Sequence, residues 1–179
     1  MKYFLFDTET TGLPGSTILP LAKQPYIIEF YGCLAGEDGT VYDEIDTLIK
    51  PPISIPQEVV RIHGIDDEAV KDAPDFKAVE PRIRDLIGHA GALVAHNLPF
   101  DTTVLGFELR RTKTFNEVEW PSYRICTVEQ TLGIRGHRLS LSKLYEYLFD
   151  EQFKGAHRAK VDVQALTRCF VELRKRKML

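Results

Sequence analysis

The chain has 179 residues, of which 44% are hydrophobic and 27% are charged. Its length and composition predict one globular domain over residues 1–179. The formal net charge of −3 argues against a protein that coats duplex DNA electrostatically, but it does not exclude a nucleic-acid enzyme. The sequence has neither a signal-peptide pattern nor an apolar run near the roughly 18 residues of a membrane span. We therefore expect a cytoplasmic protein without a membrane partner, in which Cys33, Cys126 and Cys169 are reduced core residues.

The first third of the chain predicts mainly strands. The apolar run at residues 2–5 is typical of a strand that is covered on both faces. Residues 8–25 are rich in Thr, Gly and Pro, which predicts a loop. Residues 26–34 and 41–49 then predict an antiparallel hairpin with its turn at residues 37–39. A short helix is expected to begin near Pro56, followed by a loop at residues 62–65.

The middle of the chain predicts a helix, a strand and a second helix. Apolar residues recur at helical spacing from 76 to 87, and Pro81 is expected to kink this helix or to end its first part. Residues 91–95 form a second short apolar strand. A helix follows with Phe100, Val104 and Phe107 on one side and Asn97 as a candidate N-cap. Residues 112–124 are expected to form a loop.

The last third of the chain predicts helices. Two segments, at residues 127–132 and 140–149, precede a final helix whose buried stripe includes Val163, Leu166 and Phe170. Early strands, a central strand-to-helix unit and late helices indicate a three-layer α/β sandwich around a mixed sheet.

Two acids follow the first strand. Because residues i and i+2 of a strand point to the same face, Asp7 and Glu9 are expected to lie side by side. Two such charges about 6 Å apart repel by roughly 3 kcal/mol at an effective dielectric near 20. This arrangement predicts a divalent cation at the site.

Two further acids and a histidine belong near this pair. Asp101 follows the second buried strand, at the sheet edge where open α/β folds bind ligands. Residues five apart lie about 140° apart around a helix, so His157 and Asp162 cannot both face one site from a regular helix. We therefore expect His157 on the loop before the last helix, loosened by Gly155, and Asp162 facing inward beside the apolar stripe. An inward Asp without a partner is costly, so a metal or a cationic partner is expected.

These segments resemble the three motifs of the DEDDh 3′→5′ exonucleases, a DnaQ-like family that includes the proofreading subunit of a bacterial replicative polymerase. The motifs are Asp7-Thr8-Glu9-Thr10-Thr11-Gly12-Leu13, His96-Asn97 with Phe100-Asp101, and His157-x-Ala159-x-x-Asp162. Ile62-His63-Gly64-Ile65 also resembles a loop of this family, and the resemblance runs from residue 3 to about 170. It implies an RNase H-like fold with a mixed five-stranded sheet flanked by helices.

The resemblance also implies a set of metal ligands and a general base. Two Mg²⁺ or Mn²⁺ ions would be held by Asp7, Glu9, Asp101 and Asp162, with Asp101 acting directly or through water. His157 would take a proton from the attacking water. Together these five residues would form the catalytic site.

The residues implied in substrate binding surround that site. The resemblance implies that the first motif lies against the terminal nucleotide, where Gly12 would permit close approach and Leu13 could pack on a base. Asn97 either contacts the scissile end or caps its helix, and His63 either contacts substrate or only flanks the cleft. The full candidate set is Thr8, Thr10, Thr11, Gly12, Leu13, His63, Asn97 and Phe100.

The expected activity is release of nucleoside 5′-monophosphates from DNA 3′ ends, preferably single-stranded. RNA 3′-end trimming is the rival enzyme activity, because no residue here is seen to read the 2′-hydroxyl. A module that binds 3′ ends or a polymerase without cutting is the third alternative. The expected partners are single-stranded nucleic acid, with DNA favoured over RNA, and a DNA polymerase as a candidate.

Overall fold

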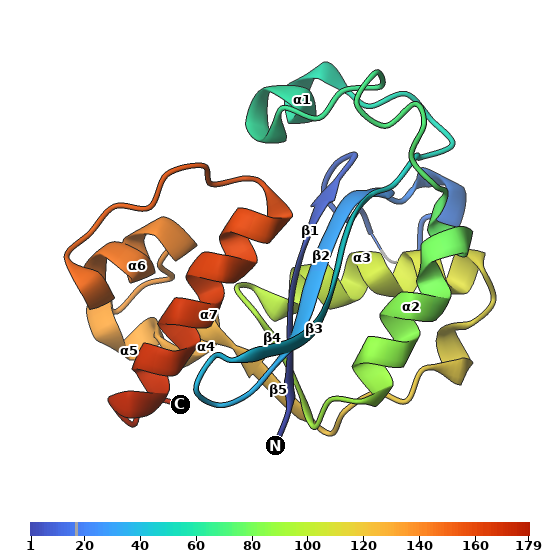
Figure 1. Ribbon diagram of the computed structural model, residues 1–179. Coiled ribbons are helices and arrows are strands. Elements are labelled where there is room, and N and C mark those ends of the chain that lie inside the picture. Colours follow the sequence, from blue (N-terminus) through green and yellow to red (C-terminus); the bar gives the residue numbers. More distant parts are fainter. Residues whose placement is uncertain (17) are drawn as a thin grey trace.

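The computed structural model describes residues 1–16 and 18–179. At its centre is a five-stranded sheet in the order β3-β2-β1-β4-β5. Strand β1 is antiparallel to β2 and parallel to β4, which confirms the predicted mixed sheet (Figure 1). Strand β2 is antiparallel to β3, which confirms the predicted hairpin. The strands are β1 (Tyr3–Thr10), β2 (Ile27–Ala35), β3 (Val41–Leu48), β4 (Ala92–Ala95) and β5 (Tyr123–Cys126).

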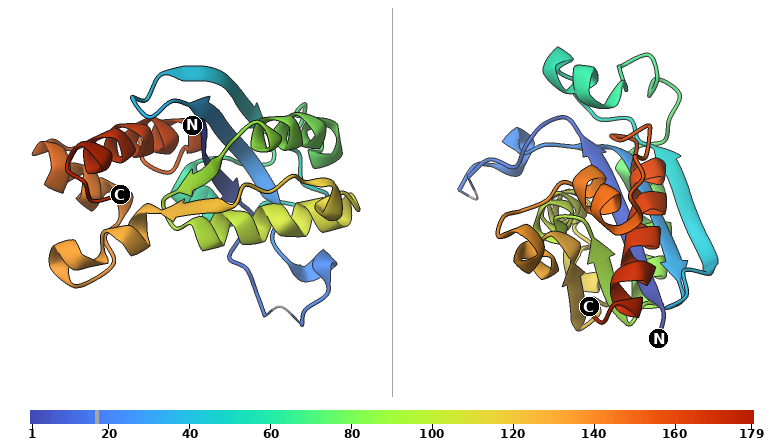
Figure 2. Two further views of the ribbon diagram at one scale, coloured as in Figure 1. Left: turned by 90° about the horizontal axis from the view of Figure 1, so that it is seen from below. Right: turned by 90° about the vertical axis from the view of Figure 1, so that its left-hand side faces the viewer.

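Helices cover both faces of the sheet, which confirms the three-layer sandwich. Helices α2 and α3 lie on one side, and α7, backed by α6, lies on the other (Figures 1 and 2). No helix in the described part of the chain is long and apolar enough to cross a membrane. The helical segments are η1 (Leu21–Lys23), α1 (Gln57–His63), α2 (Phe76–Gly88), α3 (Leu98–Arg111), η2 (Phe115–Glu117), α4 (Thr127–Gln130), α5 (Leu132–Arg135), α6 (Leu141–Phe149) and α7 (Ala159–Lys175).

Alternation along β1 assigns its side chains to two separate cores. Phe4 and Phe6 stack 5.4 Å apart in the core shared with α2 and α3. Tyr3 and Leu5 belong to the core shared with α7. Residues 7 and 9 continue the α7-facing row, and residues 8 and 10 continue the α3-facing row. Packing of the apolar residues at the start of β1 thus determines to which face of the sheet the polar side chains of residues 7–10 point.

Helix α1 stands over one end of β1 (Figure 1). It is held by a small core of its own, built from Ile28, Ile55, Ile65 and Val70. The helix ends at His63 because Gly64 adopts the left-handed conformation, with φ of 74°. Only the second half of the predicted loop at residues 62–65 is therefore a loop.

Strand β1 is longer than predicted. It pairs with β2 up to Thr10, with a register shift between Glu9 and Thr10. The predicted loop at residues 8–25 is therefore wrong for its first three residues. Asp7 and Glu9 lie within the strand, because backbone pairing with β2 continues past the apolar run.

Two other expectations are wrong. The predicted loop at residues 112–124 contains η2 and the start of β5, an edge strand whose residues Tyr123 and Arg124 are exposed and show no apolar alternation. Helix α2 runs without interruption past Pro81, so the expectation that its first part ends there is wrong. The alternative, a kink at Pro81, stays a prediction. Proline removes one backbone hydrogen bond, to the carbonyl of Lys77, and both residues are exposed to water. The three cysteines, in contrast, are free and buried as expected.

Gly32 tests how tightly the sheet packs against the aromatic core. A Cβ atom there would lie 2.4 Å from Cζ of Phe4 and 3.1 Å from Cε1 of Phe30, which are fully buried. Gly32→Ala is therefore expected to lower the free energy of unfolding by about 1–3 kcal/mol, measured by urea denaturation. Gly133→Ala is the control, because a Cβ there meets no atom within 4 Å. Equal stability of the two variants would contradict this account.

Candidate active site

Three carboxylates converge beside β1. One oxygen each from Asp7, Glu9 and Asp162 lies within 4.8 Å of the others. Asp7 and Glu9 come from the α7-facing row of β1, and Asp162 comes from the first turn of α7. The start of α7 lies near the end of β1 (Figure 1). The two elements therefore bring together acids that are more than 150 residues apart in the sequence.

Burial opposes the charged form of each of these acids. It raises the pKa of Asp7 well above the ordinary value, and the charges of Asp101, Asp162 and Glu9 raise it further. Burial and Asp162 raise the pKa of Glu9 to about 8. Burial also raises the pKa of Asp162. A hard divalent cation would reverse this cost, and clustered carboxylate oxygens are the ligands that Mg²⁺ and Mn²⁺ prefer. The donor set therefore fits the expected metal.

Asp101 lies on the α3 side of the sheet. It is buried in the first turn of α3 and accepts a 2.9 Å hydrogen bond from Oγ1 of Thr8. Burial raises its pKa to about 7, although the Thr8 hydroxyl opposes this shift. Asp101 is not in the group of three converging acids, but its charge contributes to the raised pKa of Asp7. Its part in metal binding stays a prediction, and the Thr8 side chain orients it.

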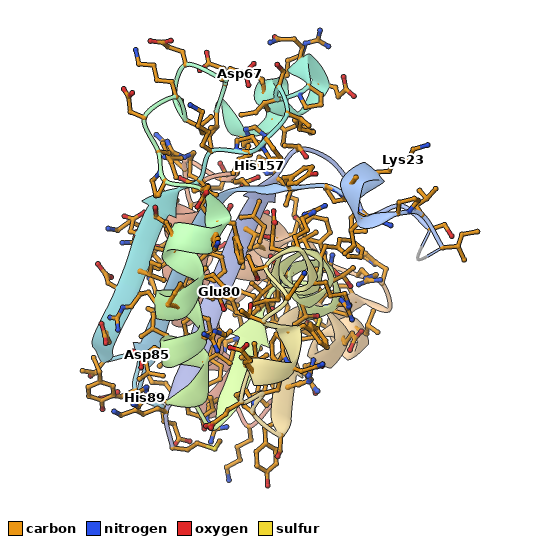
Figure 3. The ribbon with its side chains drawn as sticks, turned by 90° about the vertical axis from the view of Figure 1, so that its right-hand side faces the viewer. Lys23, Asp67, Glu80, Asp85, His89 and His157 are labelled. Carbon is orange, nitrogen blue, oxygen red and sulfur yellow. The ribbon has the colours of Figure 1, made fainter. Side chains whose placement is uncertain are left out.

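His157 lies on the loop before α7, as predicted. Its φ of 69° is in the left-handed region, and Gly155 nearby also has positive φ. The backbone N–H of His157 donates a 2.8 Å hydrogen bond to Oδ2 of Asp162. Its side chain lies at the end of the sheet, below the α1 segment (Figure 3). One of the three converging acids thus also holds the backbone of the histidine.

A cavity of about 600 Å³ opens between the end of β1 and α1. Most of the predicted substrate-binding residues line it, together with Glu9 and His157. The sequence analysis did not predict three lining residues of α1, which are Glu58, Val59 and Ile62. Ile62 is 57% exposed, which is unusual for an apolar side chain and could not be seen in the sequence. The lining residues are Thr8, Glu9, Thr10, Gly12, Leu13, Glu58, Val59, Ile62, His63, Phe100 and His157.

Two predicted substrate contacts do not line this cavity. Thr11 is buried, and its Oγ1 accepts a hydrogen bond from the N–H of Tyr26. Asn97 occupies the N-cap position of α3, but its side chain makes no capping hydrogen bond. Its Oδ1 instead accepts a 3.0 Å hydrogen bond from Arg138. The predicted capping by the Asn97 side chain is therefore wrong, because a φ of 79° places this residue in the left-handed region.

His63 is a neutral donor at the cavity wall. It is buried, and burial lowers its pKa. Its Nδ1 accepts a 3.0 Å hydrogen bond from the N–H of Ile65. The ring proton therefore resides on Nε2.

Glu29 is a further acid that the sequence analysis missed. It is buried in β2 and lies directly opposite Glu9. Its signal was available, because Glu29 is the one charged residue in the apolar stretch 26–34. Arg158, next to His157, was likewise given no role, yet it pairs with Glu29.

The family is decided by a match that spans nearly the whole chain. The RNase_T model, described as an exonuclease family, matches residues 4–170. The chain belongs to the RNase_T exonuclease family. The predicted resemblance to DnaQ-like exonucleases is thereby confirmed.

Curated relatives of this exonuclease-family chain include replication proteins. DNA polymerase III subunit epsilon of Haemophilus influenzae is 29% identical over 178 residues, covering 92% of the chain and 64% of the relative. DNA polymerase III PolC-type of Bacillus subtilis is 29% identical over 168 residues, covering 91% of the chain and 11% of the relative. The chain thus spans less than two thirds of either relative.

Solved structures share the fold of this family member. The nuclease domain of 3′hExo, a DEDDh family member solved with rAMP, superposes with a TM-score of 0.75 at 16% identity, covering 98% of this chain and 92% of that one. Exonuclease X, solved with 5′-overhanging duplex DNA, has a TM-score of 0.65 at 24% identity, with 97% and 92% coverage. These likenesses confirm the RNase H-like sandwich.

The raised pKa values predict a link between pH, metal and stability. A group with a raised pKa binds more protons when folded, so the free energy of unfolding falls as pH rises toward the folded pKa, about 8 for Glu9. In EDTA we expect a lower Tm at pH 8 than at pH 7. Mg²⁺ or Mn²⁺ should restore it, because cations bind the deprotonated carboxylates. Calorimetry measures both effects.

Asp7→Asn is the control for this link. The variant removes one buried charge from the cluster, so in EDTA at pH 8 it should melt above the wild type. It should also gain less stability from Mn²⁺. An unchanged response of this variant to Mn²⁺ would exclude Asp7 as a ligand.

Proposed function

We propose that this chain is a metal-dependent 3′→5′ exonuclease that releases nucleoside 5′-monophosphates from DNA, preferably from single-stranded ends. The convergence of Asp7, Glu9 and Asp162 beside a cavity lined by His157 carries this proposal. The site combines acids that can hold cations, a histidine that can move a proton, and space for a terminal nucleotide.

The acids define the position of the reacting phosphodiester. Asp7, Glu9 and Asp162, together with Asp101, would hold two Mg²⁺ or Mn²⁺ ions. Bound there, the ions would lower the pKa of the attacking water and stabilise the leaving 3′ oxygen. Glu9 also lines the cavity, so the cavity and the acid cluster share one side chain.

His157 serves as the general base in this proposal. It lines the cavity and is exposed, so its imidazole can accept the proton of the attacking water. Its backbone bond to Asp162 keeps the base next to a proposed metal ligand. Proton removal and cation binding would therefore take place side by side.

The cavity walls suit a nucleobase and its sugar. Leu13 is 82% exposed, and Phe100 lies on the wall that α3 provides. Both can pack against a base without selecting its sequence. These contacts fit a terminal nucleotide of any sequence.

A groove of about 650 Å³ along α3 supports a single-stranded substrate. Arg110 lies 3.9 Å from the ring centre of Phe115, and Arg124 lies 5.7 Å from that of Trp120. Guanidinium groups on aromatic rings provide both charge for phosphates and faces for unpaired bases. Phe100, at the other end of α3, lines the active-site cavity. The groove could thus hold the strand that leads to the site.

DNA is favoured over RNA because curated relatives include DNA polymerase III subunits. The same relatives support a DNA polymerase as a candidate partner. RNA 3′-end trimming is the rival activity.

A ladder assay tests the substrate. With Mg²⁺ or Mn²⁺, 5′-labelled single-stranded DNA is expected to shorten one nucleotide at a time from its 3′ end, faster than matched duplex or RNA, with Asp7→Asn as the inactive control. Faster trimming of RNA would replace the DNA assignment. No cutting of any oligonucleotide would favour a non-catalytic binding module.

His157→Ala tests the general base. Loss of the proton acceptor is expected to lower kcat by about 10²–10⁴-fold. The increase in Tm with Mn²⁺ should persist, because the proposed ligands are intact. A kcat within twofold of the wild type would remove His157 from this role.

A further inference from the structure

Glu29 is an acid beside the site that takes no part in the acid cluster. It lies directly opposite Glu9 on the neighbouring strand and is 3% exposed. Like charges in that position repel each other. Asp7, Glu9 and Asp162 group together without Glu29. Its carboxylate therefore requires other partners.

Those partners are the residues that begin α7. Oε1 of Glu29 accepts hydrogen bonds from Nη2 and Nε of Arg158, at 2.7 and 3.0 Å. Oε2 accepts from Nε of Arg158 at 3.3 Å and from the backbone N–H of Ala159 at 2.9 Å. Both carboxylate oxygens are thus engaged, which leaves Glu29 poorly placed to bind a metal. Fork-like pairing with a guanidinium also fixes geometry well.

This pairing anchors the segment that carries two catalytic candidates. Arg158 and Ala159 directly follow His157, and Asp162 lies one turn further along α7. His157 itself is held in the left-handed conformation by its N–H bond to Asp162. A shift of Arg158 would therefore move the imidazole and the carboxylate together.

We propose that Glu29 and Arg158 are positioning residues that hold the start of α7, and thereby His157, in the geometry needed for proton transfer. The kinetic part of this inference rests on the proposed function. Misplacing a catalytic group by about 1 Å can cost about 10²-fold in rate. The pair acts through His157 and not on the substrate.

Kinetics in two backgrounds test this role. Arg158→Ala is expected to lower kcat by about 10- to 100-fold while KM for an oligonucleotide stays within twofold. Arg158→Lys should recover part of the loss. In a His157→Ala background, Arg158→Ala should cause a much smaller loss, because only the displacement of Asp162 remains.

Arg174→Ala is the matched control. Arg174 pairs with Glu37 at the opposite end of α7, with Nε 2.7 Å from Oε1. Its loss is expected to leave kcat unchanged. A raised KM with normal kcat in Arg158→Ala would indicate direct contact with the substrate and overturn the proposal. An equal loss of kcat in the His157→Ala background would overturn it as well.

Hydrogen exchange tests the anchor without relying on activity. Glu29→Gln should speed amide exchange at Ala159 and His157. The variant amide has one acceptor oxygen and so cannot accept all the hydrogen bonds from Arg158 and Ala159, and the loosened start of α7 would also expose His157. Unchanged exchange would overturn the proposed anchoring even if the enzyme is active. If the wild type cuts no nucleic acid, the proposed function fails, and the exchange result still decides whether the anchor exists.

Discussion

The site depends on half-buried acidic side chains toward the end of the central strand of the sheet. Asp7 and Glu9 occupy one face of β1, and Glu29 stands opposite Glu9 on β2. Burial and mutual repulsion disfavour the charged form of Asp7 and Glu9. Glu29 differs because Arg158 neutralises it. Acidic residues on this central strand would thus be stabilised in their charged form by cations bound near the end of β1.

The two faces of β1 carry different residues of the candidate site. The face toward α7 carries the acids that converge with Asp162. The face toward α3 carries Thr8, which orients Asp101 from the other side. Because adjacent residues of a strand point in opposite directions, one short motif can place side chains next to two helices on opposite faces of the sheet. With Asp101 included, the proposed site would draw on both layers of helices.

Much of this arrangement could be predicted from the sequence. The parity of residues 7 and 9, the place of His157 before the last helix and the inward face of Asp162 follow from strand and helix geometry. The extent of β1 could not be predicted, because pairing with β2 carries polar residues into the sheet. Strand β5 shows no apolar alternation, since it is a half-exposed edge. The partnership of Glu29 with Arg158 depends on tertiary packing across 129 residues.

Helix α1 forms one wall of the cavity but is packed separately from the acid cluster. Its small core contacts the sheet through Ile28 and Leu48 and otherwise draws on residues that follow β3. Substitutions on its cavity side can therefore reshape the space for a nucleotide without disturbing the carboxylates. If the proposed function holds, selectivity and chemistry would lie on separately packed units, so that one could change in evolution while the other is kept.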